Sequence, residues 1–250
     1  MLTIGMLGGM SWESTAVYYR LANELVRERL GGLHSADCLL RSVDFAAIER
    51  LQAAGAWREA GEVLAREAAA LRAGGAQLLL LCTNTMHEVA AQVQAAVDVP
   101  LLHIVDVTAA AVRAAGLRRV GLLATGFTMR QASYRERMAA AGVEVLVPGG
   151  AQRELVHRVI YEELCRGVVA EASRAAYREV VADLVAAGAE GIVLGCTEIE
   201  LLVGPADAPV PVFPTTRLHV TAAVERALAA HDAPGAGEAA AARRDILTSR

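Results

Sequence analysis

Two continuous apolar runs, each followed by small polar residues, constrain the fold of this chain more than any other feature. The runs cover residues 78–81 and 191–194, and polar triplets follow at 83–85 (Thr-Asn-Thr) and 196–198 (Cys-Thr-Glu). Strands that are buried on both faces of a parallel sheet have continuous apolar sequences of this kind. Because ligands of open α/β sheets bind at the carboxyl ends of strands, the two triplets are the candidate site.

The segments that precede the two runs also resemble each other. A Gly-Ala pair at 75–76 and another at 188–189 each follow a helical pattern and come just before a run. Counting forward from these pairs without a gap places Thr83 opposite Cys196. The sequence therefore predicts an α/β fold with two pseudo-symmetric lobes, each a mostly parallel sheet flanked by helices. The active site is expected in the cleft between the lobes.

The order of predicted strands and helices suggests where the lobes divide. We predict an N-terminal lobe from residues 1–104 together with 214–232, whose helix returns to the first half, and a C-terminal lobe from 105–213. Among the predicted helices, one covers 86–97 and another 129–141. The final segment, 233–250, is rich in Ala, Gly and Arg and is predicted to be disordered.

Composition excludes several classes of function. All 24 residues in the Lys+Arg count are Arg, so the chain lacks the lysine that pyridoxal-phosphate enzymes and P-loops require. A net charge of -4 argues against a nucleic-acid partner. The four cysteines form no CxxC pair, and we predict neither a metal nor a cofactor. With no signal segment or membrane span in the pattern, a cytoplasmic protein with reduced thiols is expected.

Cys196 is the strongest candidate for chemistry. At a strand end before a predicted helix N-terminus, its thiol could have a lowered pKa and act as a base or nucleophile. A buried core cysteine is the usual alternative. Thr83 is a poor proton acceptor near neutral pH, and Cys82, whose side chain points to the other face of the strand, is expected to be structural. His87 and His219 are at most supporting hydrogen-bond partners.

Three stretches resemble the cofactor-independent aspartate/glutamate racemases. They are residues 8–15 (GGMSWEST), 82–87 (CTNTMH) and 195–198 (GCTE). The resemblance runs from residue 1 to about residue 230 and is strongest to the bacterial broad-specificity amino-acid (L-aspartate/glutamate-specific) racemases. It implies a homodimer of two-lobed subunits, with two facing acid/base residues in each cleft. These would be Cys196 and Thr83, since the commoner Cys-Asn-Thr motif reads Thr-Asn-Thr here.

The resemblance also implies roles for the surrounding residues. The side chains that would contact an amino-acid substrate are Met10, Gln52, Thr83, Asn84, Thr85, Thr197 and Glu198. Our hypothesis is that the Cys196 thiolate removes the α-proton from one enantiomer, while Thr83 or a water it holds reprotonates the other face. Abstraction on the Thr83 side should be slow. Asn84, Thr197 and backbone N–H groups at helix N-termini could bind the α-carboxylate, and Glu198 the ammonium.

Other functions remain open at this point. The same scaffold serves hydantoin racemases, maleate isomerases and arylmalonate decarboxylases, some of which use a single cysteine. A different class of function is an amino-acid sensor that retains the cleft without turnover. Aspartate or glutamate would need a cation or several donors for the side-chain carboxylate, and Arg41 and Arg50 lie close to Gln52 in the sequence. No membrane partner is expected.

Overall fold

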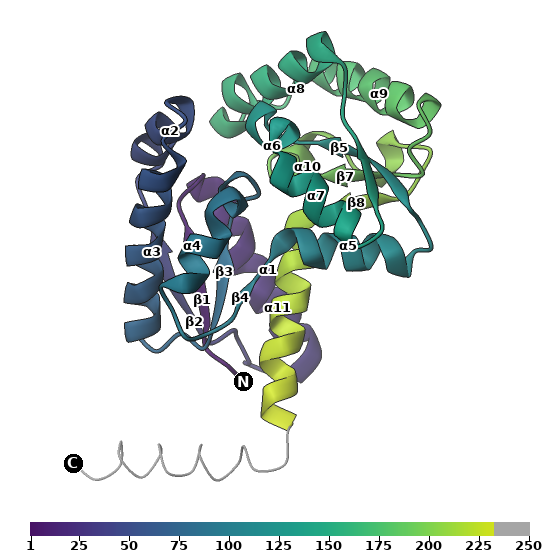
Figure 1. Ribbon diagram of the computed structural model, residues 1–250. Helices are drawn as coiled ribbons and strands as arrows, with labels where there is room; N and C mark the ends of the chain where they lie inside the picture. Colours follow the sequence, from purple (N-terminus) through teal and green to yellow (C-terminus); the bar gives the residue numbers. More distant parts are fainter. Residues whose placement is uncertain (233–250) are drawn as a thin grey trace, which may run out of the picture.

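The computed structural model describes residues 1–232, and it contains two parallel sheets of four strands each (Figure 1). The first sheet has the order β2-β1-β3-β4, with β1 (Ile4–Gly8), β2 (Cys38–Ser42), β3 (Leu78–Leu81) and β4 (Leu101–Leu102). The second has the order β6-β5-β7-β8, with β5 (Arg119–Leu123), β6 (Glu144–Leu146), β7 (Gly191–Leu194) and β8 (Val212–Pro214). The identical strand order confirms the prediction of two pseudo-symmetric α/β lobes.

Helices flank both sheets. The first sheet is accompanied by α1 (Trp12–Leu30), α2 (Phe45–Ala53), α3 (Trp57–Ala73), the 3-10 helix η1 (Thr85–Val89) and α4 (Ala90–Ala95). The second is accompanied by α5 (Ile104–Ala114), α6 (Gly126–Arg130), α7 (Ala132–Ala140), α8 (Gly150–Glu162), η2 (Leu164–Arg166), α9 (Glu171–Ala186), α10 (Ile199–Leu202) and η3 (Pro205–Asp207). The last helix, α11 (Thr215–Asp232), runs back beside the first lobe (Figure 1).

Two apolar interfaces join the connecting helices to the lobes. In α11, Val220 and Val224 are buried in the same cluster as Tyr18 of α1. In α5, Ile104 and Val112 belong instead to the core of the second lobe. The lobe bounds 1–104 plus 214–232 and 105–213 stay a prediction, although Ile104 packs with the second lobe. The predicted disorder of 233–250 concerns residues outside the described part of the chain.

Two glycines bring the start of α1 close to the end of β1. A Cβ atom on Gly8 would lie 2.4 Å from the Thr15 methyl carbon, and Gly9 has a φ of 89°, which favours glycine. The turn then places Ser11 as the N-cap of α1, where its side chain accepts a hydrogen bond from the Ser14 N–H, as expected. The start of α1 therefore lies at the carboxyl edge of the sheet.

Two predicted helices differ from those observed. The helix expected at 86–97 begins as the 3-10 turn η1 and ends at Ala95. The helix expected at 129–141 is split into α6 and α7, because Gln131 between them is extended. The Gln131 side chain donates a hydrogen bond of 3.0 Å to the Thr85 carbonyl. This hydrogen bond joins the residue between α6 and α7 to the first lobe. A helical sequence pattern does not predict such a tertiary contact.

Candidate active site

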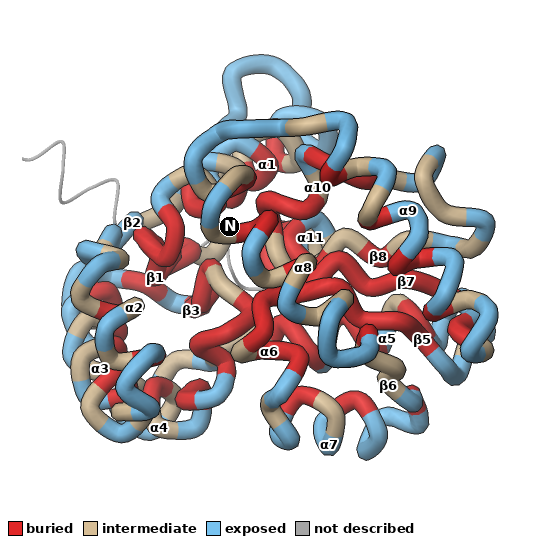
Figure 2. The backbone as a smooth tube through the Cα atoms, turned by 90° about the horizontal axis from the view of Figure 1, so that it is seen from above, coloured by how far each residue is buried: buried red, intermediate tan, exposed pale blue. Residues whose placement is uncertain are grey.

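The carboxyl edges of the two sheets face each other across one small cavity. Buried segments of both lobes meet in this region (Figure 2). The cavity volume is about 30 Å³. Sixteen residues line it: Met10, Ser11, Ser14, Phe45, Gln52, Thr83, Asn84, Thr85, Thr125, Ile160, Tyr161, Cys165, Gly195, Cys196, Thr197 and Glu198. All eight residues predicted for the site are among them.

Cys196 faces a carboxylate across a short distance. Its Sγ lies 2.9 Å from Oε2 of Glu198, to which the thiol donates. Burial, followed by the negative charge of Glu198, raises the pKa of the Cys196 thiol well above its usual value. The expected lowering of this pKa is therefore wrong. The helix that follows, α10, has only four residues, so its dipole offsets little of this effect.

Glu198 is the one carboxylate that lines the cleft. It is buried, and Ser11 Oγ donates a hydrogen bond of 2.6 Å to its second oxygen, Oε1. The Cys165 thiol also lies against it: burial, together with the charge of Glu198, raises the pKa of Cys165 to about 12. Within residues 1–232 no arginine or histidine forms an ion pair with this carboxylate. Among the described residues, the Ser11 hydroxyl and the Cys196 thiol donate hydrogen bonds to it.

The Thr83 edge is uncharged. The neighbouring Thr85 hydroxyl lies 3.1 Å from the Thr125 hydroxyl and 3.0 Å from that of Thr128, both in the second lobe. The Thr83 carbonyl accepts a hydrogen bond of 2.7 Å from the Nδ1–H of His87. A neutral hydroxyl without an adjacent base is a weak proton acceptor. This edge is therefore equipped to deliver a proton more readily than to remove one.

The two histidines singled out in the sequence lie behind the cleft and do not line it. His87 Nε2 accepts the Ile104 N–H at 3.1 Å, which assigns the proton of the neutral ring to Nδ1. His219 lies 3.0 Å from the Tyr18 hydroxyl and 2.9 Å from the Leu102 carbonyl. Burial lowers the pKa of each to about 3. Both rings are thus neutral and act as hydrogen-bonded supports.

Two amide side chains leave acceptors without a partner. Asn84 Nδ2 donates to the Thr215 hydroxyl at 2.9 Å, and that hydroxyl donates in turn to the Leu194 carbonyl at 2.8 Å. Because the only hydrogen of Thr215 is used in this way, Asn84 must present its nitrogen there, which leaves Oδ1 free. Gln52 Nε2 lies 2.8 Å from Met86 Sδ, and Gln52 Oε1 also lacks a partner.

The arginines near Gln52 in the sequence do not line the cavity. Arg41 forms an ion pair with Glu67 on an exposed surface. Arg50, on α2, is exposed and is likewise absent from the lining. Neither side chain, as placed here, can neutralise a carboxylate in the cleft.

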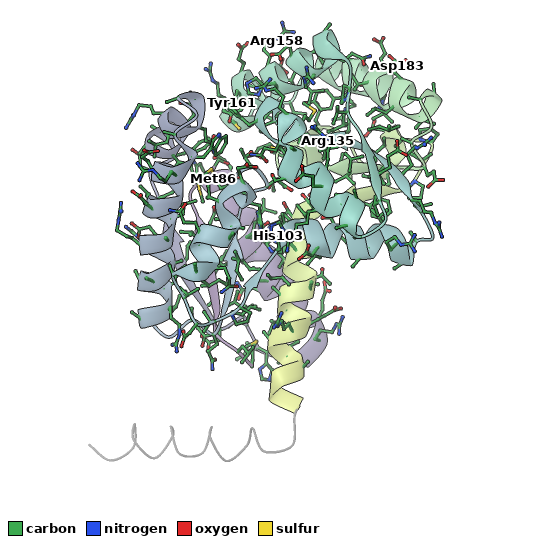
Figure 3. The ribbon with its side chains drawn as sticks, in the orientation of Figure 1. Met86, His103, Arg135, Arg158, Tyr161 and Asp183 are labelled. Atoms are coloured by element: carbon green, nitrogen blue, oxygen red, sulfur yellow. The ribbon has the colours of Figure 1, made fainter. Side chains whose placement is uncertain are left out.

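Several lining residues could not be assigned from the sequence. Thr125 could have been found, because Thr125 and Thr128 are three residues apart after β5, as Ser11 and Ser14 are after β1. The remaining ones carried no comparable signal: Phe45 begins α2, Ile160 and Tyr161 lie near the end of α8, and Cys165 belongs to η2. Figure 3 labels Tyr161 on the second lobe and Met86 on the first.

Two further features bear on ligands and surroundings. Within residues 1–232, no three His, Cys, Asp or Glu side chains gather as a metal ion would require. In the same part of the chain, no helix combines the length and apolar character needed to cross a bilayer.

Comparison with known proteins identifies similar sequences and folds. Residues 7–223 match the family model described as Asp/Glu/Hydantoin racemase. A Yersinia pestis structure provisionally assigned as an Asp/Glu racemase is 51% identical, covers 91% of this chain and 100% of its own, and superposes with a TM-score of 0.86. An aspartate racemase homologue from Pyrococcus horikoshii is 33% identical, with 91% and 100% coverage and a TM-score of 0.80. An uncharacterised Pectobacterium carotovorum protein is 32% identical over 102 residues, 41% of this chain and 67% of that protein.

Proposed function

This chain belongs to the Asp/Glu/hydantoin racemase family, and we propose that it is an amino-acid racemase that works without pyridoxal phosphate. One observation carries the proposal. Thr83 and Cys196 are each the second residue after the central strand of their lobe, and both line the same cleft. Racemisation needs one group that removes the α-proton and another that protonates the opposite face. Two facing side chains from equivalent positions meet this requirement.

In the proposed mechanism Glu198 activates Cys196. The thiol passes its proton to the carboxylate 2.9 Å away, and the thiolate then takes the substrate α-proton. The raised pKa of Cys196 makes its thiolate scarce but a stronger base once formed. A substrate ammonium bound near Glu198 would offset the negative charge there and favour the thiolate. Substrate binding would in this way increase the fraction of Cys196 that is present as thiolate.

Reprotonation is proposed to occur from the Thr83 side. The Thr83 hydroxyl, or a water it holds, would deliver a proton to the carbanion on the face opposite Cys196. The alkoxide or hydroxide that is left would regain a proton from solvent, and Glu198 would release to solvent the proton it took from the thiol. The α-carboxylate is proposed to lie against Asn84 and Thr197, where donors stabilise the charge that develops on it. Met10, Gln52 and Thr85 are proposed to complete the surroundings of the substrate.

Aspartate and glutamate are the first substrates to test. They are the amino acids that the names of the similar structures contain. The decarboxylases and isomerases of this scaffold are the alternative enzymes, because some of them use a single cysteine and the Thr83 side has a hydroxyl in place of a second thiol. A sensor without turnover is the alternative from another class.

Proton NMR in D2O tests the function. The purified protein is incubated separately with L- and D-aspartate and L- and D-glutamate, and loss of the α-proton signal is followed. Exchange of one enantiomer much faster than the other would support a single efficient base. Equal and fast exchange of both would show that the Thr83 side holds a better base than proposed. Binding by calorimetry without any exchange would identify a sensor instead.

We also propose that the protein is a homodimer. Trp12, Tyr19 and Leu30 are 67%, 51% and 46% exposed and recur at intervals that place them along one side of α1. An exposed apolar stripe of this kind is typical of an interface. Light scattering coupled to gel filtration should give twice the chain mass, and Tyr19→Asp should lower it toward the monomer. Arg113→Asp, an exposed change on α5, should leave the mass unchanged.

A further inference from the structure

We propose that Tyr18 and His219, which lie outside the cleft, are positioning residues that set the direction of a hydrogen-bonded chain ending at Ser14. This direction makes the Ser14 oxygen an acceptor for the substrate ammonium. The inference rests on the proposed racemase function and adds Ser14 to the groups that bind the substrate. The chain consists, from its far end to the cleft, of the Leu102 carbonyl, His219, Tyr18, Thr216, Thr197 and Ser14.

The far end of the chain is fixed by an acceptor. His219 Nε2 lies 2.9 Å from the Leu102 carbonyl, and a carbonyl oxygen can only accept. Nε2 therefore carries the proton of the ring, which is neutral because burial lowers its pKa to about 3. Since Nδ1 is then an acceptor, the Tyr18 hydroxyl, 3.0 Å away, donates to it.

Each hydroxyl of the chain has a single hydrogen, so the direction passes from one link to the next. Burial raises the pKa of the Tyr18 phenol well above its usual value, and a hydrogen bond from the Thr216 hydroxyl acts in the opposite direction. Because Thr216 donates to Tyr18, its oxygen accepts from the Thr197 hydroxyl at 3.0 Å. The Thr197 oxygen in turn accepts from the Ser14 hydroxyl at 2.6 Å.

The cleft end of the chain presents lone pairs. Ser14 and Thr197 both line the cavity, but their hydroxyl hydrogens are directed away from a substrate. Ser11 accepts the Ser14 N–H and donates to Glu198, so the Ser14 oxygen and the carboxylate belong to the same side of the cleft. An ammonium has three N–H donors and no acceptor, which matches these two groups. Any donor that Thr197 offers to the α-carboxylate is then its backbone N–H.

Burial maintains this direction. Tyr18, Thr216 and His219 are all 0% exposed, so water does not compete for their hydrogen bonds. Reversal of the bond between Thr216 and Thr197 would leave the Tyr18 oxygen without a donor, and a buried polar atom without a partner is costly. Tyr18 and His219 thus act on the substrate site through Thr216 and Thr197, without contacting the substrate.

The tautomer of His219 tests the direction in the protein without substitutions. Nitrogen–proton correlation NMR of the histidine rings distinguishes Nε2–H from Nδ1–H, and the signals that disappear in His219→Gln identify this ring. We expect a proton on Nε2 and none on Nδ1. A proton on Nδ1 would reverse the chain and overturn the inference, whatever the activity of the protein.

Isosteric variants of Thr216 test the effect on substrate binding. Thr216→Val removes the acceptor of the Thr197 hydrogen, so KM of the fastest-exchanging amino acid should rise about tenfold, as expected for one lost hydrogen bond to a charged group. The ammonium contact is the same in substrate and transition state, so kcat should stay within about twofold. Thr216→Ser keeps the hydroxyl and should retain the wild-type KM. Tyr18→Phe should raise KM by a smaller factor.

A matched control and an analogue without the ammonium complete the test. Tyr177→Phe removes a buried phenol that donates to the Val156 carbonyl at 3.0 Å, and KM should not change. Succinate and glutarate have both carboxylates of aspartate and glutamate but no ammonium, so their inhibition constants should be the same in Thr216→Val as in the wild type.

The outcomes separate this inference from the proposed function. An unchanged KM in folded Thr216→Val, or an equal loss of affinity for succinate and glutarate, would overturn the inference and leave the racemase function standing. No exchange from any of the four acids in the wild type would overturn the proposed function, and the His219 tautomer would then decide the inference. Circular dichroism melting identifies a variant that does not fold, in which case the tautomer again decides.

Discussion

The two sheet edges that form the cleft share a backbone plan but differ in chemistry. Leu81 pairs with the end of β1, and Leu194 with the end of β5, so the two central strands end at the same level in their lobes. Two residues later the first lobe has Thr83 and the second has Cys196. Two residues beyond these, the counterpart of Glu198 is Thr85. One edge thus has a thiol and a carboxylate where the other has two hydroxyls.

The contacts across the cleft repeat this difference. Ser11, the N-cap of α1, donates to Glu198 of the second lobe. Thr125, the N-cap of α6, contacts Thr85 of the first lobe. Each edge is therefore held by the helix that follows the first strand of the opposite lobe, but one contact includes a charge and the other does not. The two lobes contribute equivalent backbone positions to the cleft, but a few side chains give its two faces different charge and acidity.

Thermodynamics limits which rates can reveal the difference between the two faces. The two enantiomers are equally stable, so kcat/KM for racemisation must be the same in both directions. The unequal edges can show instead in exchange without inversion: the enantiomer whose α-proton faces Cys196 can lose it to solvent and regain a deuteron on the same face. The predictions below measure that difference.

The largest expected effect comes from removing the thiol. Cys196→Ser should lower α-proton exchange of the faster enantiomer about 10³-fold, because a hydroxyl does not replace a thiolate as the base. The slower exchange from the Thr83 side should change less. NMR in D2O measures both rates. Cys38→Ser, at a half-buried thiol of β2 outside the cleft, is the matched control, and near-normal exchange in Cys196→Ser would refute the assignment of the base.

Glu198→Gln separates two effects of the carboxylate. Without its negative charge the pKa of Cys196 should fall, so alkylation of this thiol by iodoacetamide should reach its midpoint at a lower pH than in the wild type. Exchange should nevertheless fall about 10²-fold, since the acceptor of the thiol proton is lost. In the wild type, exchange should rise with pH, because a raised pKa leaves little thiolate near neutrality.

The controls for this carboxylate are direct. Glu225→Gln removes an exposed acidic group that pairs with Arg29 and should change neither the alkylation midpoint nor the exchange rate. If Glu198→Gln alkylates at lower pH yet exchanges at the wild-type rate, Glu198 acts through its charge alone and does not accept the proton.

Thr83→Cys should reduce the difference between the edges. A thiol at this position supplies a better base on the weak side, and exchange of the slower enantiomer should rise about tenfold. The gain is modest because Thr85 still stands where the other edge has a carboxylate. Thr83→Ser keeps the hydroxyl and serves as control. No change in the ratio of the two exchange rates would show that the Thr83 side chain does not reach the substrate.

The smallest expected effects come from the two caps. Ser11→Ala and Thr125→Ala should each cost about 1 kcal/mol in the free energy of unfolding through loss of the N-cap. Ser11→Ala also removes a donor from a buried carboxylate, so its kcat/KM should fall further than that of Thr125→Ala. Urea unfolding and NMR exchange give the two quantities. Equal losses of activity would show that the charge at Glu198 does not depend on Ser11.

Much of the fold could be predicted from the sequence, because the patterns that indicate strands and repeats involve residues close together in the chain. The runs at 78–81 and 191–194 and the Gly-Ala pairs before them predicted the strands and the repeat. The pairing of Thr83 with Cys196 followed from counting residues. The helix at 129–141 was predicted wrongly because the extended Gln131 is held by the Thr85 carbonyl of the other lobe, a contact between residues far apart in the chain.

The sequence by itself determined the parallel α/β lobes and the polar triplets at their strand ends. Only the tertiary structure decided the electrostatics of the cleft. In the folded chain Glu198 accepts hydrogen bonds from Ser11 and Cys196, and burial raises the pKa of the Cys196 thiol. Arg41 lies outside the cleft, where it forms an ion pair with Glu67. Strand pattern follows from neighbouring residues, whereas pKa and charge balance depend on which distant groups are brought together and removed from water.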